Sequence, residues 1–173
     1  MTNNRWLSAC FLFISCTQPE PATVRRYFDL EGYFEQEIIR LEKQNSNVIK
    51  TVSRNGLAEK KDNISPNWIT ELSLFVESDI NKPAWSDSYM IRSGKSSTTY
   101  TALESKLRTR SMLIRRNKGG NIKQIVLFNS TKNYLYSASE ELHYIPDSLY
   151  SIKKKQDVIL LGSNSYEISG SFK

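Results

Sequence analysis

The second half of the chain is a series of short β-type runs separated by residues that are typical of tight turns. From Tyr89 to the C-terminus, valine, isoleucine, tyrosine, phenylalanine and threonine recur in short stretches. Turn residues interrupt them at Gly94, at Gly119 and Gly120, at residues 131–133, at Pro146 and Asp147, and at residues 162–164. This spacing favours an antiparallel meander, because tight turns join antiparallel neighbours whereas parallel strands need long crossovers.

Two runs within this region carry more specific information. Residues 125–128, Ile-Val-Leu-Phe, are apolar at every position, which predicts a central strand that is buried on both faces, Phe128 included. In residues 106–116 the apolar phase slips between Leu107 and Met112. We interpret that slip as a β-bulge or a change of face along a curved strand.

Two helices are predicted in the first half of the chain. The first has Asp29 as a plausible N-cap and runs toward Asn45. Its apolar stripe is Leu30, Phe34, Ile38 and Leu41. The second is predicted to begin with Ser65 as cap and Pro66 at the first helical position. Its apolar face is Trp68, Leu72, Phe75 and Val76.

A hairpin is predicted between these helices. Val48–Arg54 reads as a strand, Asn55 and Gly56 form a strong two-residue turn signal, and residues 57–61 return. The expected fold class is therefore α+β, with two helices packed on one face of a curved antiparallel sheet of about seven or eight strands.

The first twenty residues have a different character. One positive charge, Arg5, precedes an apolar stretch at residues 6–15, then Cys16, then a polar segment with two prolines. This stretch is shorter than the roughly 20 apolar residues that a membrane-spanning helix needs. The arrangement resembles a bacterial lipoprotein signal, with residues 13–16, Phe-Ile-Ser-Cys, as its lipobox. A second match at residues 7–10, Leu-Ser-Ala-Cys, has the better motif but leaves only a short apolar segment, and it ranks second.

The resemblance implies cleavage before Cys16 and lipid attachment to that cysteine. Residues 1–15 are then a signal peptide, residues 16–26 a flexible tether and residues 27–173 a single globular domain. The expected location is the cell envelope, in the outer membrane facing the periplasm or the cell surface. The mature region resembles small uncharacterised lipoproteins of Bacteroidota, and in outline it is similar to the outer-membrane lipoprotein carrier and receptor proteins.

Few residues in the chain offer catalytic or metal chemistry. Both cysteines, Cys10 and Cys16, lie in the opening stretch, so cleavage before Cys16 leaves no disulfide, thiolate metal site or cysteine nucleophile inside the domain. The single histidine, His143, has no metal-binding partner at a suitable spacing and no nucleophile motif beside it. We therefore expect no metal, no cofactor and no enzymatic activity.

The charged residues suggest one candidate site. A net charge of +6 without tight clustering does not indicate a nucleic-acid-binding protein. Lys106, Arg108 and Arg110 fall on one face of a predicted strand, and Lys153 and Lys155 lie in a later one. If those two strands are neighbours, the five cations form a patch that contacts anions such as phosphate head groups. Otherwise they form a solvated face.

Two functions are compatible with this organisation. The first is a non-enzymatic binding or assembly module, monomeric and held at the membrane by its lipid, with a protein of the envelope as partner. The second is a carrier of a lipid-like or apolar ligand between the sheet and its helices. A tunnel lined by tyrosines and Phe128 favours the carrier, whereas a filled interior favours the module. A lipid anchor requires no other membrane-binding device, and none is expected.

Overall fold

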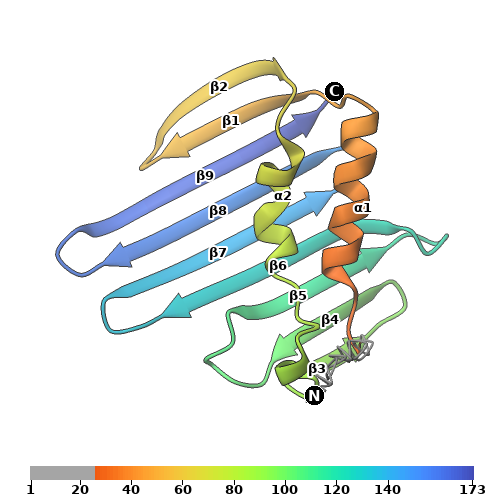
Figure 1. Cartoon of the computed structure of the whole chain (residues 1–173), viewed down its shortest axis with the longest axis vertical. Helices are drawn as coiled ribbons and strands as arrows, with labels where there is room; N and C mark the ends of the chain where they lie inside the picture. Colours follow the sequence, from red (N-terminus) through yellow and green to blue (C-terminus); the bar gives the residue numbers. More distant parts are fainter. Residues whose placement is uncertain (1–25) are drawn as a thin grey trace, which may run out of the picture.

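The computed structural model describes residues 26–173, so Cys16 and the predicted signal peptide lie outside the described residues (Figure 1). This part of the chain contains the α-helices α1 (Leu30–Lys43) and α2 (Trp68–Val76) and the short 3-10 helix η1 (Pro83–Trp85). The strands are β1 (Val48–Arg54), β2 (Leu57–Ile64), β3 (Tyr89–Ser93), β4 (Ser97–Ala102), β5 (Thr109–Arg116), β6 (Ile122–Lys132), β7 (Tyr136–Ile145), β8 (Leu149–Val158) and β9 (Gly162–Phe172).

All described strands form one open antiparallel sheet in the order β2-β1-β9-β8-β7-β6-β5-β4-β3. Strands β3 to β9 form the predicted meander, and the β1–β2 hairpin adds to its far edge by pairing with β9. The sheet has nine strands, more than the predicted seven or eight. The predicted turns include none between Gly94 and Gly119, whereas a loop at residues 103–108 separates β4 from β5. This loop contains no glycine or proline, so it leaves no clear turn signal in the sequence.

The two helices lie on the same face of the sheet (Figure 1). The α1 helix begins as predicted, with the Asp29 carboxylate accepting a hydrogen bond from the Gly32 amide at 2.9 Å. The predicted start of α2 is wrong: the cap is Asn67, which accepts from the Thr70 amide at 3.0 Å, and Ser65 lies outside the helix. Ser65 and Asn67 are both good capping residues, and the helix begins after Asn67, where Trp68 enters the core.

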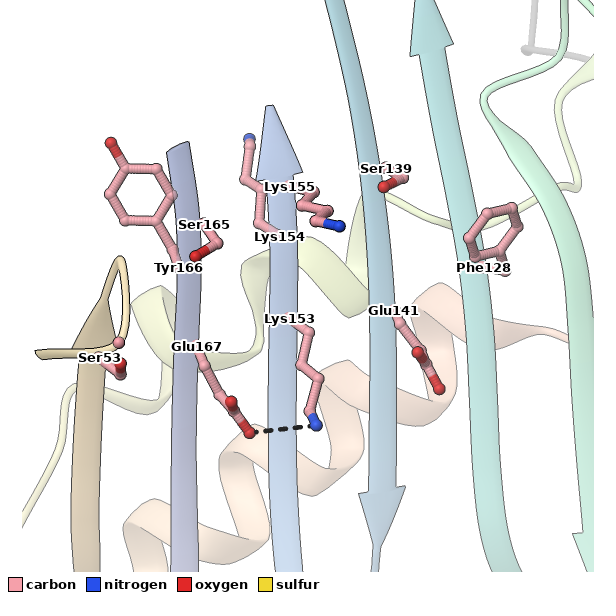
Figure 2. Close-up of a pocket in the computed structure, with 11 residues that line it drawn as sticks. Ser53, Phe128, Ser139, Glu141, Lys153, Lys154, Lys155, Ser165, Tyr166 and Glu167 are labelled. Atoms are coloured by element: carbon pink, nitrogen blue, oxygen red, sulfur yellow. Dashed lines mark ion pairs between the residues drawn. The ribbon is translucent and has the colours of Figure 1, made fainter. Parts of the chain in front are cut away.

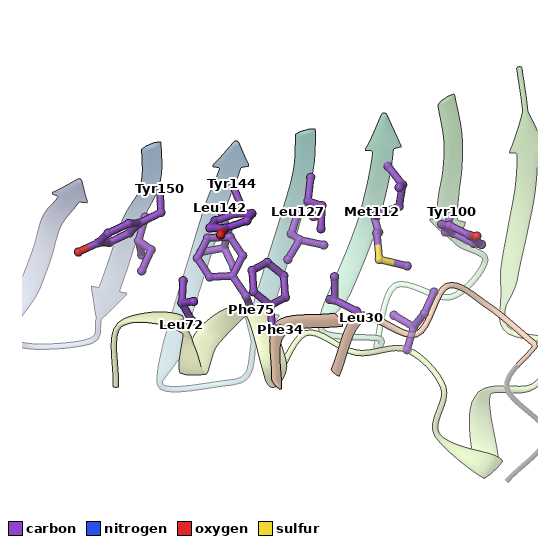
Figure 3. Packing of buried hydrophobic residues seen from close by; sticks show 14 of the residues in the cluster. Leu30, Phe34, Leu72, Phe75, Tyr100, Met112, Leu127, Leu142, Tyr144 and Tyr150 are labelled. Atoms are coloured by element: carbon purple, nitrogen blue, oxygen red, sulfur yellow. The ribbon is translucent and has the colours of Figure 1, made fainter. Parts of the chain in front are cut away.

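Large side chains fill the space between the helices and the sheet (Figure 3). Phe34 of α1, Phe75 of α2 and Tyr144 of β7 meet there, with ring centroids 4.8 Å apart for the two phenylalanines and 5.1 Å apart for Phe34 and Tyr144. All three side chains are fully buried. Because burying one such ring stabilises a fold by roughly 2 kcal/mol or more, this layer is the main source of stability.

Each helix is also attached to the sheet by a buried tyrosine. The Tyr144 hydroxyl donates to Glu37 of α1 at 2.6 Å, and the Tyr150 hydroxyl donates to Glu71 of α2 at 2.8 Å. Burial, together with the hydrogen bond to a carboxylate, raises the pKa of both phenols far above the ordinary value. The carboxylates are themselves paired with cations, Arg40 for Glu37 and Lys50 for Glu71. Both phenols therefore stay protonated and continue to donate at every physiological pH.

Candidate functional site

The face of the sheet that the helices leave uncovered, called the open face here, is the candidate site. Its side chains alternate along every strand with those that face the helices. Small hydroxyl residues make up much of it, namely Thr51, Ser53, Ser111, Ser130, Ser137, Ser139, Ser151, Ser165, Ser169 and Ser171. Because these side chains are short, the backbone of the strands lies close to the surface.

A row of five residues from five strands crosses the middle of the open face. Strand pairing places Phe128 opposite Glu141, Glu141 opposite Lys153, and Lys153 opposite Glu167. Ser53 of β1 completes the row opposite Glu167. The Lys153 ammonium forms an ion pair with the Glu167 carboxylate at 3.3 Å (Figure 2). Aromatic, negative, positive and negative side chains therefore follow one another across the sheet.

This row lies in a shallow hollow of about 420 Å³ that extends from β1 to β6. A second row borders it, in which Ser139 lies opposite Lys155 and Lys155 opposite Ser165. Lys155 has no ion-pair partner among the described residues. In the first row, the Glu141 carboxylate also contacts the His143 ring at 2.7 Å. The hollow therefore offers donors, acceptors and the aromatic rings of Phe128 and Tyr166 over a wide area, which suits a polar macromolecular surface.

The prediction that Phe128 is buried on both faces is wrong. Its neighbours on the helix-covered face, Ile125 and Leu127, are fully buried, but Phe128 itself is 43% exposed. The reason is that the helices cover one face only, and no described element covers the other. The run at residues 125–128 is apolar at every position, but Phe128 nevertheless lies on the open face.

The five predicted cations do not form one patch. Strands β6 and β7 lie between β5 and β8, so the condition that the two strands are neighbours is not met. Lys106 lies in the loop before β5, and Arg108 turns toward the helix-covered side. Of the five, Lys153 and Lys155 lie on the open face. Arg110 of β5 donates to the backbone carbonyl of Glu104, in the loop before that strand. The patch was predicted wrongly for two reasons. Alternation within a strand does not reveal which strands pair. In addition, the predicted bulge is present at residues 109–111 and shifts which residues of β5 face the helices.

Arg108 instead belongs to a buried ionic cluster centred on Glu140. The Glu140 carboxylate pairs with Arg108 at 2.8 Å and with Lys154 at 3.0 Å. Asn129 donates to both Glu140 and the Ser78 hydroxyl at the end of α2. Burial raises the pKa of Glu140, but Lys154, Arg108 and Asn129 together outweigh it and hold the pKa below its ordinary value. The cluster is therefore an ionised structural link between α2 and the sheet.

The sequence pattern does not predict that Glu141, Glu167, Ser139 and Ser165 are neighbours in one site. Each of these four residues is a polar position in a strand that alternates apolar and polar residues, and this was the only signal in the sequence. Their position side by side depends on the register between the strands. No helix within residues 26–173 is long and apolar enough to cross a membrane. No group of three or more potential metal ligands occurs in the same residues. No protein-family model, no curated protein and no solved structure matches this chain.

Proposed function

We propose that this protein is a membrane-tethered envelope lipoprotein whose domain acts as a non-enzymatic binding module, with the open face as its binding surface. One observation carries the proposal: a nine-stranded sheet is covered by helices on one side only. Uncovered sheet faces of this width are suited to contact with another molecule, and here Phe128 and two adjacent polar rows occupy the centre.

The packing of the interior supports a module in preference to a carrier. A carrier of an apolar ligand needs space between helices and sheet. That space holds the fully buried rings of Phe34, Phe75, Tyr144 and Tyr150 (Figure 3). Tyr144 and Tyr150, which a tunnel would need as lining residues, are thus packed in the core, and Phe128 points to the other side of the sheet.

The proposed partner is a folded protein of the envelope. Its surface would present charges complementary to the alternating row of Glu141, Lys153 and Glu167, and an apolar contact for Phe128. We propose that the sheet is curved, as the sequence predicts, which agrees with the register shifts in the β1–β2 and β5–β6 pairs. Such curvature would account for the hollow in which these residues lie.

Site-specific photo-crosslinking tests the binding surface. A photoreactive amino acid is placed at Phe128 in the full chain, expressed in the cells that naturally produce it. The matched control carries the same group at Glu35, which is exposed on α1. We expect one discrete adduct from position 128 and none from position 35, and Lys153→Glu should reduce the yield at position 128. Adducts from position 35 alone, or from neither position, would overturn the proposal.

Metabolic labelling with a fatty acid tests the lipid anchor. The wild type should incorporate label and fractionate with membranes, and Cys16→Ala should abolish both. Cys10→Ala is the matched control and should leave both unchanged. Loss of label in Cys10→Ala alone would place the cleavage site at the second motif, and label in neither wild type nor variants would show that the lipoprotein interpretation is wrong.

A further inference from the structure

The two ends of the sheet differ in the residues that form their hairpin turns. At one end the β5–β6 and β7–β8 turns consist of residues 117–121 and 146–148, which are polar or glycine and proline. At the other end lie the β6–β7 and β8–β9 turns, visible as the two loops that project furthest at the left of Figure 1. Five large apolar side chains in these two turns are between 54% and 99% exposed: Tyr134, Leu135, Ile159, Leu160 and Leu161. We call these five residues the apolar tip.

The two turns of the apolar tip form one continuous surface. The Ile159 amide donates to the Leu135 carbonyl at 3.1 Å, which joins the β8–β9 turn to the β6–β7 turn. Within the β6–β7 turn, Asn133 accepts hydrogen bonds from the amides of Leu135 and Tyr136 at 3.0 and 2.8 Å. Hydrogen bonds from the amides of Leu135, Tyr136, Ile159 and Leu161, within and between the two turns, therefore hold the apolar side chains together.

The backbone at Leu160 makes the choice of residue unusual. Leu160 has a φ of +74°, a conformation that branched side chains rarely adopt. The other described non-glycine residues with positive φ are asparagine or aspartate: Asn45, Asn55, Asn63 and Asp147. Leucine at this position is unfavourable twice, because its backbone is strained and because 99% of its surface is exposed to water. Asparagine or glycine would relieve both costs, so an apolar environment outside the described residues would explain the leucine.

We infer that the apolar tip inserts into the interface of an anionic lipid bilayer. The tip consists of projecting hairpin turns, and a bilayer accommodates projecting apolar side chains without a preformed complementary hollow. Lys132 and Lys155 lie on the adjoining surface with Asp157, and neither lysine has an ion-pair partner among the described residues. Their net positive charge complements anionic head groups, and Tyr134 combines an aromatic ring with a polar hydroxyl that suits the interface.

This inference changes the expectation that a lipid anchor is the only membrane contact. It does not rest on that anchor or on the open face as a binding surface. The predicted turns lie at residues 131–133 and 162–164, so these five residues fall within predicted β-runs, whereas the strands end before them at Lys132 and Val158.

A fluorescent reporter tests insertion in the full chain. A noncanonical amino acid with an environment-sensitive fluorophore replaces Leu160, and in the control protein it replaces Lys118 in the polar β5–β6 turn. Both proteins are mixed with vesicles of phosphatidylcholine and phosphatidylglycerol that contain nitroxide-labelled acyl chains. We expect a blue shift and quenching at position 160 and neither at position 118, regardless of what holds the chain on the vesicle. Equal behaviour of the two positions would overturn the inference, including the case in which a protein, not lipid, covers the tip.

A second variant separates insertion from folding. The reporter moves to Leu135, and Leu160→Asn is combined with Leu161→Asn. This double variant should fold at least as well as the wild type, because asparagine tolerates positive φ. The equilibrium constant for its insertion into the bilayer should be about tenfold lower or more, because the variant lacks the apolar surface that the two leucines bury in the wild type. Unchanged quenching at position 135 would contradict the inference. The crosslinking experiment at Phe128 uses another surface and another readout, so the two proposals fail independently.

Discussion

The two faces of the sheet use the same strands for different purposes. Along β6, Leu127 is fully buried under the helices, while the next residue, Phe128, is 43% exposed on the open face. Along β7, Glu140 lies in a buried ionic cluster, while Glu141 lies in an exposed row. In both pairs, residues of similar chemistry occupy different environments because the helices pack on one side only. Burial in this domain is therefore decided by the helices more than by the apolar pattern of a strand.

The helix-covered face stabilises the fold, and we propose that the open face serves for contact. The former combines large rings with polar groups that are paired, such as Tyr144 with Glu37 and Tyr150 with Glu71. The latter combines short hydroxyl side chains with charges whose contribution to stability is small. Substitutions of adjacent residues on opposite faces test this division directly.

Adjacent substitutions in β6 should give the largest difference. Leu127→Asp places a carboxylate in the packed layer, where it cannot be solvated, and should cost more than about 4 kcal/mol. Phe128→Asp should cost less than about 1 kcal/mol, because water reaches position 128. Urea unfolding followed by circular dichroism measures both. A Phe128→Asp protein that fails to fold would mean that the open face is covered in the native state.

A smaller difference is expected in β9. A Cβ atom at Gly170 would overlap the Tyr150 ring, which packs directly over this position on the helix-covered side. Gly170→Ala should therefore destabilise the fold by about 2 kcal/mol through overpacking. Ser171→Ala, the next residue on the open face, should change the free energy of unfolding by less than about 0.5 kcal/mol. Equal thermal midpoints for the two variants would contradict the close packing of Tyr150 on β9.

The Glu140 cluster should contribute a pH dependence. Because the pKa of Glu140 is lower in the folded state than the unfolded value of about 4.3, its contribution to stability is complete above that value. The contribution is lost as the pH falls through the lower pKa of the folded state. Glu140→Gln should cost about 1–2 kcal/mol near pH 7 and flatten the loss of stability below about pH 5.

Glu141→Gln is the matched control for Glu140→Gln, since position 141 is next along β7 and lies on the open face. It should leave the free energy of unfolding near pH 7 within about 0.5 kcal/mol of the wild type. Urea midpoints measured between neutral and acidic pH compare the two variants. A Glu140→Gln profile parallel to that of the wild type would show that the cluster is not ionised as described.

The smallest effect is expected for the cations of the open face. Lys153→Gln combined with Lys155→Gln removes one exposed ion pair and one unpaired charge, and should change stability by less than about 0.5 kcal/mol. The same variant should reduce photo-crosslinking from Phe128. A loss above about 1 kcal/mol would assign these lysines to folding, and the open face would then resemble the helix-covered face in function.

Local elements were predictable because their causes are local. The Asp29 cap, the bounds Val48–Arg54 and the turn at Asn55 and Gly56 agree with the structure. Each depends on capping, periodicity or turn geometry within a few residues. The start of α2 was predicted two residues early because Ser65 and Asn67 are both good caps, and only packing of Trp68, fully within the core, selects between them.

The α+β class, the meander from β3 to β9 and the apolar stripes of both helices were predictable from the pattern of residues along the chain. Packing between distant segments sets the rest: β6 and β7 separate β5 from β8, Phe128 faces outward and Arg108 faces Glu140. Periodicity tells which residues of one strand share a face, but it contains no information on the neighbour of that strand or on which face the helices cover. Those choices depend on contacts between residues far apart in the chain, which form only when the whole core packs.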